Sequence, residues 1–481
     1  MTTRAAFLVV SILLVCPLGS GQSGAPAVPR QTTAPVPAPS AGGSLQGPFA
    51  GGVPSGSVTA GVTALTLHAA IERGLRQNLG LFLAGLGTRS AQATRLIAMS
   101  GLLPNVAASM SNTGEQINLR ALGFSGFPGI PTIVGPFNVF DARLSATQTL
   151  LNFSALRNWR AGSENLRAAE LSAQDARDVV VLVVAGLYLQ AVAGRARIDS
   201  SQAQVNTAQT LYQRAADQKK AGVVAGIDVL RSQVELQAQR QRLIYFQNEF
   251  EKQKLSLARA IGMPLGQQFT LADQAPYTPV PELTLEQALQ QAYQGRADLR
   301  SAGALVSAAE FSKKAAEGER LPSLDFAGNY GDIGPRPWDS HGTFSAGVTL
   351  NIPVYTGGRT RADILAADAQ LQQRKAQLAD LRSAVEQDLR TAFLDLKASG
   401  DQVQVAQSAV DLAGQQMKQS EDRFAAGVTN NVEVVQSQEA VATANDNYIS
   451  ALFAYNLAKA SLARALGGAE KMYLQFLGGG H

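Results

Sequence analysis

Few side chains in this sequence are spaced to do chemistry together. The three histidines, His68, His341 and His481, are far apart, and none has carboxylates at a spacing typical of a metal site. The only cysteine is Cys16, and the sequence contains neither a GxxxxGKS or GxxxxGKT phosphate loop nor a GxSxG nucleophile elbow. We therefore expect no enzyme activity, no cofactor and no bound metal ion.

Two acidic residues do occupy matching positions. Asp228 follows Gly222 by six residues in the stretch KKAGVVAGIDVL, and Glu433 follows Gly427 by six residues in RFAAGVTNNVEVV. A glycine can adopt the left-handed conformation that ends a helix, so each stretch predicts a sharp reversal of the chain. With Asn430 as the N-cap and Glu433 at N3, the second stretch predicts a capping box at the start of the next helix.

Composition excludes some classes of protein. The 481 residues carry a net charge of +4 that is not gathered into a basic face, which argues against a nucleic-acid partner. Residues 1–21 have the pattern of a signal peptide, and Cys16 leaves lipid attachment open. Residues 22–63 are rich in Pro and Gly and predict a flexible N-terminal segment. After residue 21 we expect no stretch apolar enough for a transmembrane helix, and we interpret the apolar run 179–189 as part of a buried helix.

The chain repeats itself. LTL at Leu65 pairs with LTL at Leu283, and the Leu-Pro step at Pro104 pairs with that at Pro322, both at an offset of 218. Further on, AGV at Ala221 pairs with AGV at Ala426 at an offset of 205. The difference between the two offsets arises in the Gly- and Pro-rich connection after Pro104, where a surface loop tolerates extra residues. We expect a first repeat at 64–264, a second at 282–468 and a C-terminal tail at 469–481.

Each repeat contains an unusually long helical pattern. Residues 154–220 and 356–425 show apolar residues at helical spacing without proline, and each run would form a helix about 100 Å long. The segments 227–261 and 283–320 predict shorter helices that stack end to end, antiparallel to a long one. In the same way we expect 432–466 to stack on 65–102.

The strand signals lie between the helices. FSAGVTLNIPV alternates apolar with small polar residues, and its apolar side is formed by Phe344, Ala346, Val348, Leu350 and Ile352. Strands are predicted within about 104–150 in the first repeat and about 322–355 in the second. Strands of about 10 residues with one apolar face suit a membrane barrel. We therefore expect Phe344, Val348, Leu350 and Ile352 to face lipid.

The doubled pattern resembles the outer-membrane efflux protein family, the TolC-like outer-membrane channels. The resemblance covers about residues 64–468 and rests on the LTL starts, the Leu-Pro steps and four further stretches, namely QTLLNFSALRN, NIPVYTGGRTR, AGVVAGIDVL and AGVTNNVEVV. It implies a mainly α fold with a small membrane β-barrel, built from two tandem repeats of long α-helical hairpins plus a β-hairpin. It also implies a homotrimer with a 12-stranded barrel and a helical tunnel.

The resemblance also implies a function. It implies a passive exit duct for a tripartite efflux or type I secretion system, in the outer membrane of a Gram-negative-type cell with helices extending into the periplasm. Its partners would be outer-membrane lipid, a periplasmic adaptor (membrane fusion) protein and an inner-membrane pump. The adaptor would dock on the two reversals, at Gly222, Val223, Val224, Gly427, Val428 and Thr429.

Two alternatives remain open on sequence alone. In a trimer, Asp228 and Glu433 would form rings of three carboxylates at the tunnel entrance, although capping is the favoured interpretation. A soluble periplasmic coiled-coil scaffold or an adaptor protein would also use Ala- and Gln-rich antiparallel helices. A scaffold, however, has no use for alternating strands at the helix ends.

Overall fold

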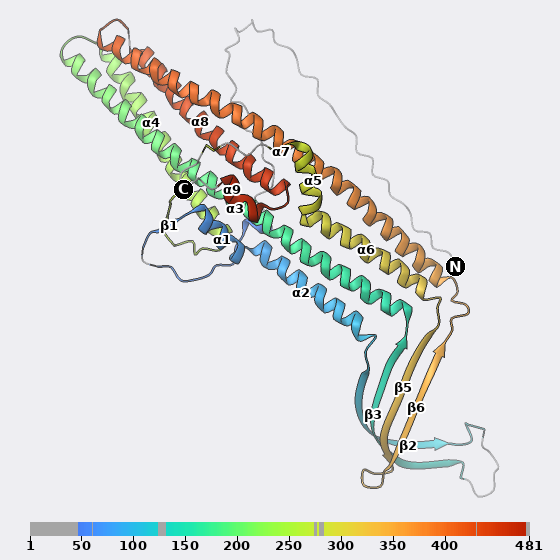
Figure 1. Ribbon diagram of the computed structural model, residues 1–481. Coiled ribbons are helices and arrows are strands. Elements are labelled where there is room, and N and C mark those ends of the chain that lie inside the picture. The colour runs from blue at the N-terminus through green and yellow to red at the C-terminus, as the bar shows by residue number, and fades with distance from the viewer. Residues whose placement is uncertain are drawn as a thin grey trace, which may run out of the picture. The chain divides into compact units, whose positions relative to one another are not determined.

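A computed structural model describes residues 47–59, 61–123, 131–273, 277–278, 283–429 and 431–477. Most of these residues are helical, and a four-stranded sheet lies at one end of the long helices (Figure 1). The predicted fold class, long helical hairpins with a small set of strands, is confirmed. The elements are η1 (Pro48–Ala50), β1 (Thr63–Leu65), α1 (Leu67–Gln77), α2 (Leu79–Ser100), β2 (Asn105–Asn118), β3 (Ile133–Leu151), α3 (Phe153–Lys220), α4 (Gly226–Ala260), β4 (Phe269–Leu271), α5 (Leu285–Gly295), α6 (Ala297–Gly318), β5 (Ser323–Gly334), β6 (His341–Asn351), α7 (Arg359–Ala425), α8 (Asn431–Ala465) and α9 (Ala469–Leu477).

The two long helices are α3, with 68 residues, and α7, with 67. The start of α3 is capped by Asn152, whose side chain accepts a hydrogen bond from the backbone N–H of Ala155 at 2.9 Å. The start of α7 follows Gly357 and Gly358, both at positive φ, so the chain bends there as it leaves the sheet. At about 1.5 Å per residue, each helix is about 100 Å long, as predicted.

Each of the two predicted helices 65–102 and 283–320 is in fact two helices. The chain breaks at Asn78 (φ −66°, ψ 131°) and at Arg296 (φ −63°, ψ 122°), which are equivalent positions 218 residues apart. Neither position carries a proline, and the extended backbone of one residue is enough to separate α1 from α2 and α5 from α6. The single-helix prediction was therefore wrong in the same way in both repeats.

The predicted stacking partners were also wrong. The side chain of Asn78 donates a hydrogen bond to the Ala260 carbonyl at 3.1 Å, so the end of α4 meets the start of α2. A Cβ on Gly467 would lie 2.7 Å from the backbone nitrogen of Arg296, so the end of α8 meets the start of α6. Each repeat thus stacks its returning helix on its own earlier helix. We call these meeting points the first joint (Asn78) and the second joint (Arg296).

The elements form columns in a constant order. At the sheet end the sequence of neighbours is α2, α3, α6 and α7, and toward the hairpin turns it is α4, α3, α8 and α7 (Figure 1). The sheet continues this order as β2, β3, β5 and β6. The columns α2/α4/β2 and α7/β6 are consequently the two edges of the chain, and α3, α6 and α8 lie between them.

The strands align their apolar residues on one face. Directly paired residues of antiparallel strands point to the same side, and the register pairs Val106 with Ala146, Ala146 with Gly328 and Gly328 with Ala346. Following this register, the apolar residues of one face are Val106, Ala108, Met110, Ala142, Leu144, Leu324, Phe326, Tyr330, Phe344, Val348 and Leu350, and the same face also carries Asn112, Gln148 and Asp332. The opposite face holds mainly Ser, Thr, Asn and Asp, together with Arg143.

The main core lies around the middle of α3. Val180, Val184 and Tyr188 are buried there in one cluster with Ile71 of α1 and Leu389 of α7. By length and composition α3 contains a stretch apolar enough to cross a membrane, which corrects our expectation that none would. In that stretch 61% is buried by neighbouring elements, which agrees with the interpretation of 179–189 as a buried helix segment.

Part of the chain before α1 also has defined contacts. Phe49 accepts a hydrogen bond from the Asn78 side chain at 2.6 Å, and the N–H of Val53 donates to the Gln77 carbonyl at 2.8 Å. Gly52 lies so close to Gly262 that a Cβ would come within 2.5 Å of its nitrogen. Residues 47–59 of the segment expected to be flexible therefore pack on the first joint, while the predicted signal peptide 1–21 lies outside the described residues. At the other end, residues 469–477 of the expected tail form α9.

Candidate functional site

The two chain reversals have the same geometry. Gly222 donates its N–H to the Lys219 carbonyl at 3.0 Å, and Gly427 donates to the Phe424 carbonyl, also at 3.0 Å. Both glycines have positive φ, 73° and 71°. The next residues, Val223 and Val428, are 66% and 70% exposed. The two turns lie together at the end of the helices far from the sheet (Figure 1), and each presents an exposed valine.

The matched carboxylates each have partners within the chain. Asp228 lies 3.5 Å from Arg231. Glu433 accepts a hydrogen bond from the Thr429 hydroxyl and lies 3.5 Å from Arg423. The expected N-cap, Asn430, lies outside the described residues, so the capping box stays a prediction.

Sequence reasoning missed the residue that joins the two reversals. Asn431 is only 1% exposed, and its side-chain amide donates to the Asp228 carbonyl at 3.1 Å and to the Ser232 hydroxyl at 2.6 Å. Beneath it, Leu211, Met417, Phe424 and Val434 form a small core. The only signal in the sequence was the Asn-Asn pair itself, which does not reveal that its second member is buried between two hairpins.

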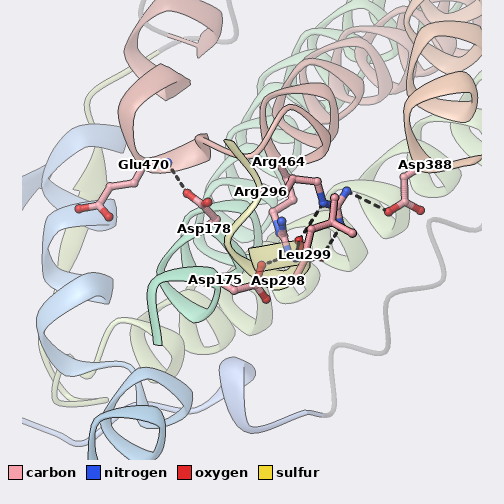
Figure 2. A network of polar contacts seen from close by, with 8 residues as sticks. All are labelled: Asp175, Asp178, Arg296, Asp298, Leu299, Asp388, Arg464 and Glu470. Carbon is pink, nitrogen blue, oxygen red and sulfur yellow. Dashed lines mark hydrogen bonds and ion pairs between the residues drawn. The ribbon is translucent and has the colours of Figure 1, made fainter. Parts of the chain in front are cut away.

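The second joint contains a network of charged side chains, centred on the buried Arg296, that no sequence motif predicted. Arg296 binds Asp298 through two nitrogens, at 3.1 and 2.6 Å, and reaches Asp388 of α7 at 3.3 Å (Figure 2). Arg464 of α8 pairs with Asp175 of α3. The charges come from α3, α6, α7, α8 and the break before α6, so this network ties both repeats together.

The end of the chain attaches to the same region. The backbone N–H of Glu470 donates to Asp178 at 2.9 Å (Figure 2), and the Glu470 carboxylate pairs with Arg177. Both contacts fix the start of α9 on α3. The second joint therefore holds elements from the middle and the end of the sequence.

Burial and pairing shift the pKa values of these groups. Burial is the main cause that raises the pKa of Asp175 above its usual value, although Arg464 opposes the shift. Burial alone would also raise the pKa of Asp298, but the hydrogen bonds and charge of Arg296 outweigh it and hold that pKa below its usual value. Two carboxylates of one network therefore shift in opposite directions.

The strand residues expected to face lipid lie on the apolar face or just beyond it. Phe344, Val348 and Leu350 belong to β6 and are exposed in the single chain, at 80%, 58% and 57%. Ile352 follows the strand and is also exposed. On the other face, Arg143 pairs with Asp141 at 2.9 Å and hydrogen-bonds Asn329 at 3.3 Å. One face of the sheet is thus fitted to an apolar medium and the other to water.

The histidines do not assemble into a site. His68 contacts the Tyr473 hydroxyl at 2.6 Å and Glu72 at 3.5 Å, which ties α1 to α9. His341 begins β6, and His481 lies outside the described residues. Among the residues that the structure describes, no group of three or more His, Cys, Asp or Glu is placed to hold a metal ion.

Comparison with known proteins shows which family and which relatives the chain resembles. The family model for outer membrane efflux proteins matches residues 71–263 and 288–468. The chain is 25% identical over 415 residues to the pyoverdine export outer membrane protein OpmQ of Pseudomonas aeruginosa, covering 84% of this chain and 85% of that protein. It is 23% identical over 427 residues to nodulation protein T of Rhizobium leguminosarum, covering 85% and 83%.

A solved structure shares the fold. The CmeC outer membrane channel of Campylobacter jejuni superimposes with a TM-score of 0.75 at 16% sequence identity, over 86% of this chain and 90% of that one. The family consists of outer-membrane channels rather than enzymes. Since the family model spans most of the chain, this outer-membrane protein belongs to the outer membrane efflux protein family.

Proposed function

We propose that the chain is one third of an exit duct that carries substrates passively across the periplasm and the outer membrane. The observation that carries this proposal is the order of columns with two open edges. The sheet ends at β2 on one side and β6 on the other, and in lipid an unpaired strand edge is not tolerated. Three copies would supply twelve strands, an even number that closes a barrel.

Strand direction supports this closure. Each neighbouring pair in the sheet is antiparallel, so β2 and β6 run in opposite directions. The β2 strand of one copy can then pair with β6 of the next in the same antiparallel manner. The shared apolar face would contact lipid, and the face with Arg143 and Asp141 would line the water-filled lumen.

The hairpin turns give the duct a place for its partners. Val223 and Val428 each offer an exposed apolar contact on their turn. We assign Gly222, Val223, Val224, Gly427, Val428 and Thr429 to docking of a periplasmic adaptor that links the duct to an inner-membrane pump. The pump would supply the energy. The relative OpmQ is named as an export protein, which supports the same direction of transport for this chain.

The docking assignment has its own test. Gly427 has φ 71° and no atom within 4 Å of an added Cβ, so Gly427→Val strains the turn without creating a clash. We expect reduced export with normal assembly, measured as substrate efflux from cells. Gly414→Val, on α7 with equal space but ordinary helical backbone, is the control. Unchanged export in Gly427→Val would contradict the docking assignment.

The duct itself is tested by single-channel conductance of the purified chain in a planar bilayer, with its mass in detergent measured alongside. Stable conductance from a species of three chains is the expected result. A water-soluble monomer or dimer that does not insert would overturn the duct and favour a periplasmic scaffold.

A further inference from the structure

Three helices enclose a cavity between the joints and the hairpin turns. Helices α3 and α4 belong to the first repeat and α8 belongs to the second, and the three lie next to one another there (Figure 1). The cavity has a volume of about 190 Å³. Its lining residues include Arg197 and Ser201 of α3, Arg242 and Phe246 of α4, and Asp446 and Ile449 of α8.

One buried hydroxyl of the cavity wall has no partner. Ser201 is 3% exposed, and its Oγ makes no hydrogen bond within the described residues. Other helical serines donate to a carbonyl four residues earlier, as Ser408 does to Gln404 at 3.1 Å. A buried polar group without a partner costs stability, and such groups are uncommon in folded proteins. The Ser201 hydroxyl is therefore a donor that a ligand in the cavity can use.

The two arginines of the cavity are held unequally. Arg197 donates from Nε to Asp446 at 2.7 Å and from a second nitrogen to the Ser450 hydroxyl at 2.9 Å. Arg242 reaches Glu439 only at 3.4 and 3.5 Å, and these two side chains are 41% and 42% exposed. An exposed pair at this distance is weak, so the Arg242 guanidinium is open to a further anion.

Charge at the cavity favours an anionic ligand. The guanidinium groups of Arg197 and Arg242 and the carboxylate of Asp446 line it, two positive charges against one negative, which leaves +1. A ligand with one carboxylate would balance this charge, whereas an ammonium ligand would add to it. A guanidinium also binds a carboxylate through two parallel N–H bonds, which fixes the orientation of the ligand.

The apolar part of the wall sets the shape and size of the ligand. It is formed by Phe246, Ala442 and Ile449. An apolar cavity of about 150 Å³ holds one benzene molecule, so a volume of about 190 Å³ has room for a benzene ring with a carboxylate attached. An aromatic ring also makes favourable contacts with the ring of Phe246.

We propose that this cavity is a binding site for a small aromatic monocarboxylate. Its ring lies against Phe246 and Ile449, while its carboxylate accepts hydrogen bonds from Arg242 and from the Ser201 hydroxyl. The site is distinct from the docking turns, because Ser201 precedes Gly222 by 21 residues, about 30 Å along α3. It does not require the proposed duct, because a single chain supplies every residue that lines it.

A bound carboxylate would join the two repeats. Arg242 belongs to the first repeat and Ile449 to the second, so a ligand held by both must be released before these helices separate. Because only the folded chain assembles the cavity, the midpoint of urea unfolding should rise with the concentration of the ligand.

Ligand-observed NMR tests the site with benzoate as the probe. Line broadening of the benzoate proton signals by the purified full chain in detergent gives the affinity, and detergent without protein is the blank. Benzamide has the same ring without the charge and should bind about 10-fold more weakly. Benzylamine carries a positive charge and should not bind.

Three variants locate the probe in the cavity. Arg242→Gln removes the cation and should weaken benzoate binding by about 10-fold. Ser201→Ala should also weaken it, while the urea midpoint of the ligand-free protein stays the same or rises, because the lost hydroxyl had no partner among the described residues. Ala442→Leu fills the cavity with carbon and should abolish binding. Ser256→Ala is the control on α4, where the hydroxyl bonds to the Lys252 carbonyl at 3.0 Å, and should leave binding unchanged.

Each outcome supports or overturns the site. Benzoate binding that all three variants weaken, with the control unchanged, supports it. Absence of binding to the wild type, or equal binding to the wild type and Ala442→Leu, overturns it. Equal affinities for benzoate and benzamide would overturn the role of Arg242. A lower urea midpoint for ligand-free Ser201→Ala would show that this hydroxyl serves the fold rather than a ligand.

Discussion

The two joints occupy equivalent positions in the repeats but are built from opposite chemistry. At the first joint, Asn78 donates to two peptide carbonyls and residues 47–59 cover the break without any charge of their own at its centre. At the second joint, Arg296 is buried and pairs with two carboxylates, Asp298 of α6 and Asp388 of α7. The two repeats therefore share the position of the helix break but differ in the side chains that fill it.

Because their side chains differ, the two joints connect different sets of helices. Asn78 reaches only backbone groups of neighbouring segments, so it fixes α4 on α2. Arg296 and Arg464 extend farther and bind side chains on α7 and α3, so the second joint fixes both long helices at once. Substitutions at each joint test this contrast.

Arg296→Met should destabilise the protein most. It leaves Asp298, whose side chain is 18% exposed, buried without its cation, and such a loss typically costs about 3–5 kcal/mol. The measurement is the midpoint of urea unfolding of the purified protein. The double variant Arg296→Met with Asp298→Leu should recover much of the loss, and a double variant as unstable as the single one would show that packing, not charge, holds the joint.

Asn78→Leu should have a smaller effect that is independent of pH. It leaves the carbonyls of Phe49 and Ala260 without their donor, a loss of about 1–3 kcal/mol. The same unfolding midpoint, measured at pH 7 and pH 5, reports it. A strong pH dependence would mean that the first joint contains a charge that the structure does not show.

Asp298→Asn and Asp175→Asn should differ in the sign of their pH dependence. The folded pKa of Asp298 is depressed, so its ionised form adds stability above the unfolded pKa of about 3.9, and this is lost as pH falls through the lower folded pKa. The folded pKa of Asp175 is raised, so burial of its charge costs stability that returns as pH falls through that pKa.

Unfolding midpoints of the wild type and both variants between pH 7 and pH 3 measure this contrast. The advantage of the wild type over Asp298→Asn should shrink with acid, most clearly below about pH 4, and its advantage over Asp175→Asn should grow. Parallel curves for the two variants would contradict the opposite pKa shifts.

Glu470→Gln should have the smallest effect. The side chains of Arg177 and Glu470 are 41% and 35% exposed, and exposed pairs contribute roughly 0.2–1 kcal/mol, while the hydrogen bond from the backbone N–H of residue 470 to Asp178 survives. Protease resistance of the C-terminal end is the appropriate measurement. Asp178→Asn serves as the comparison, and a larger effect of Glu470→Gln than of Asp178→Asn would reverse the assignment of which contact holds α9.

Much of the fold was predictable because its signals are local. The repeat, the two long helices and the strands follow from periodicity and from glycines such as Gly222 and Gly427. The two joints were not predictable. Arg296 and Asp388 meet only after the helices pack, and the extended backbone at Asn78 has no strong marker in the sequence. The stacking of α4 on α2 could not be predicted from the sequence either, because helix lengths do not reveal which helix ends meet.

The contact between His68 and Tyr473 has a consequence for the order of folding. These residues are separated by 405 positions, and Arg177 and Glu470 by 293, so the first helix and the last meet across the same core. Contacts this distant in sequence form slowly, and the core cannot close until the final residues have been synthesised and exported. Until α9 docks, the core around the middle of α3 lacks Tyr473, Phe476 and Leu477, so the last helix of the described residues completes the core that α1 begins.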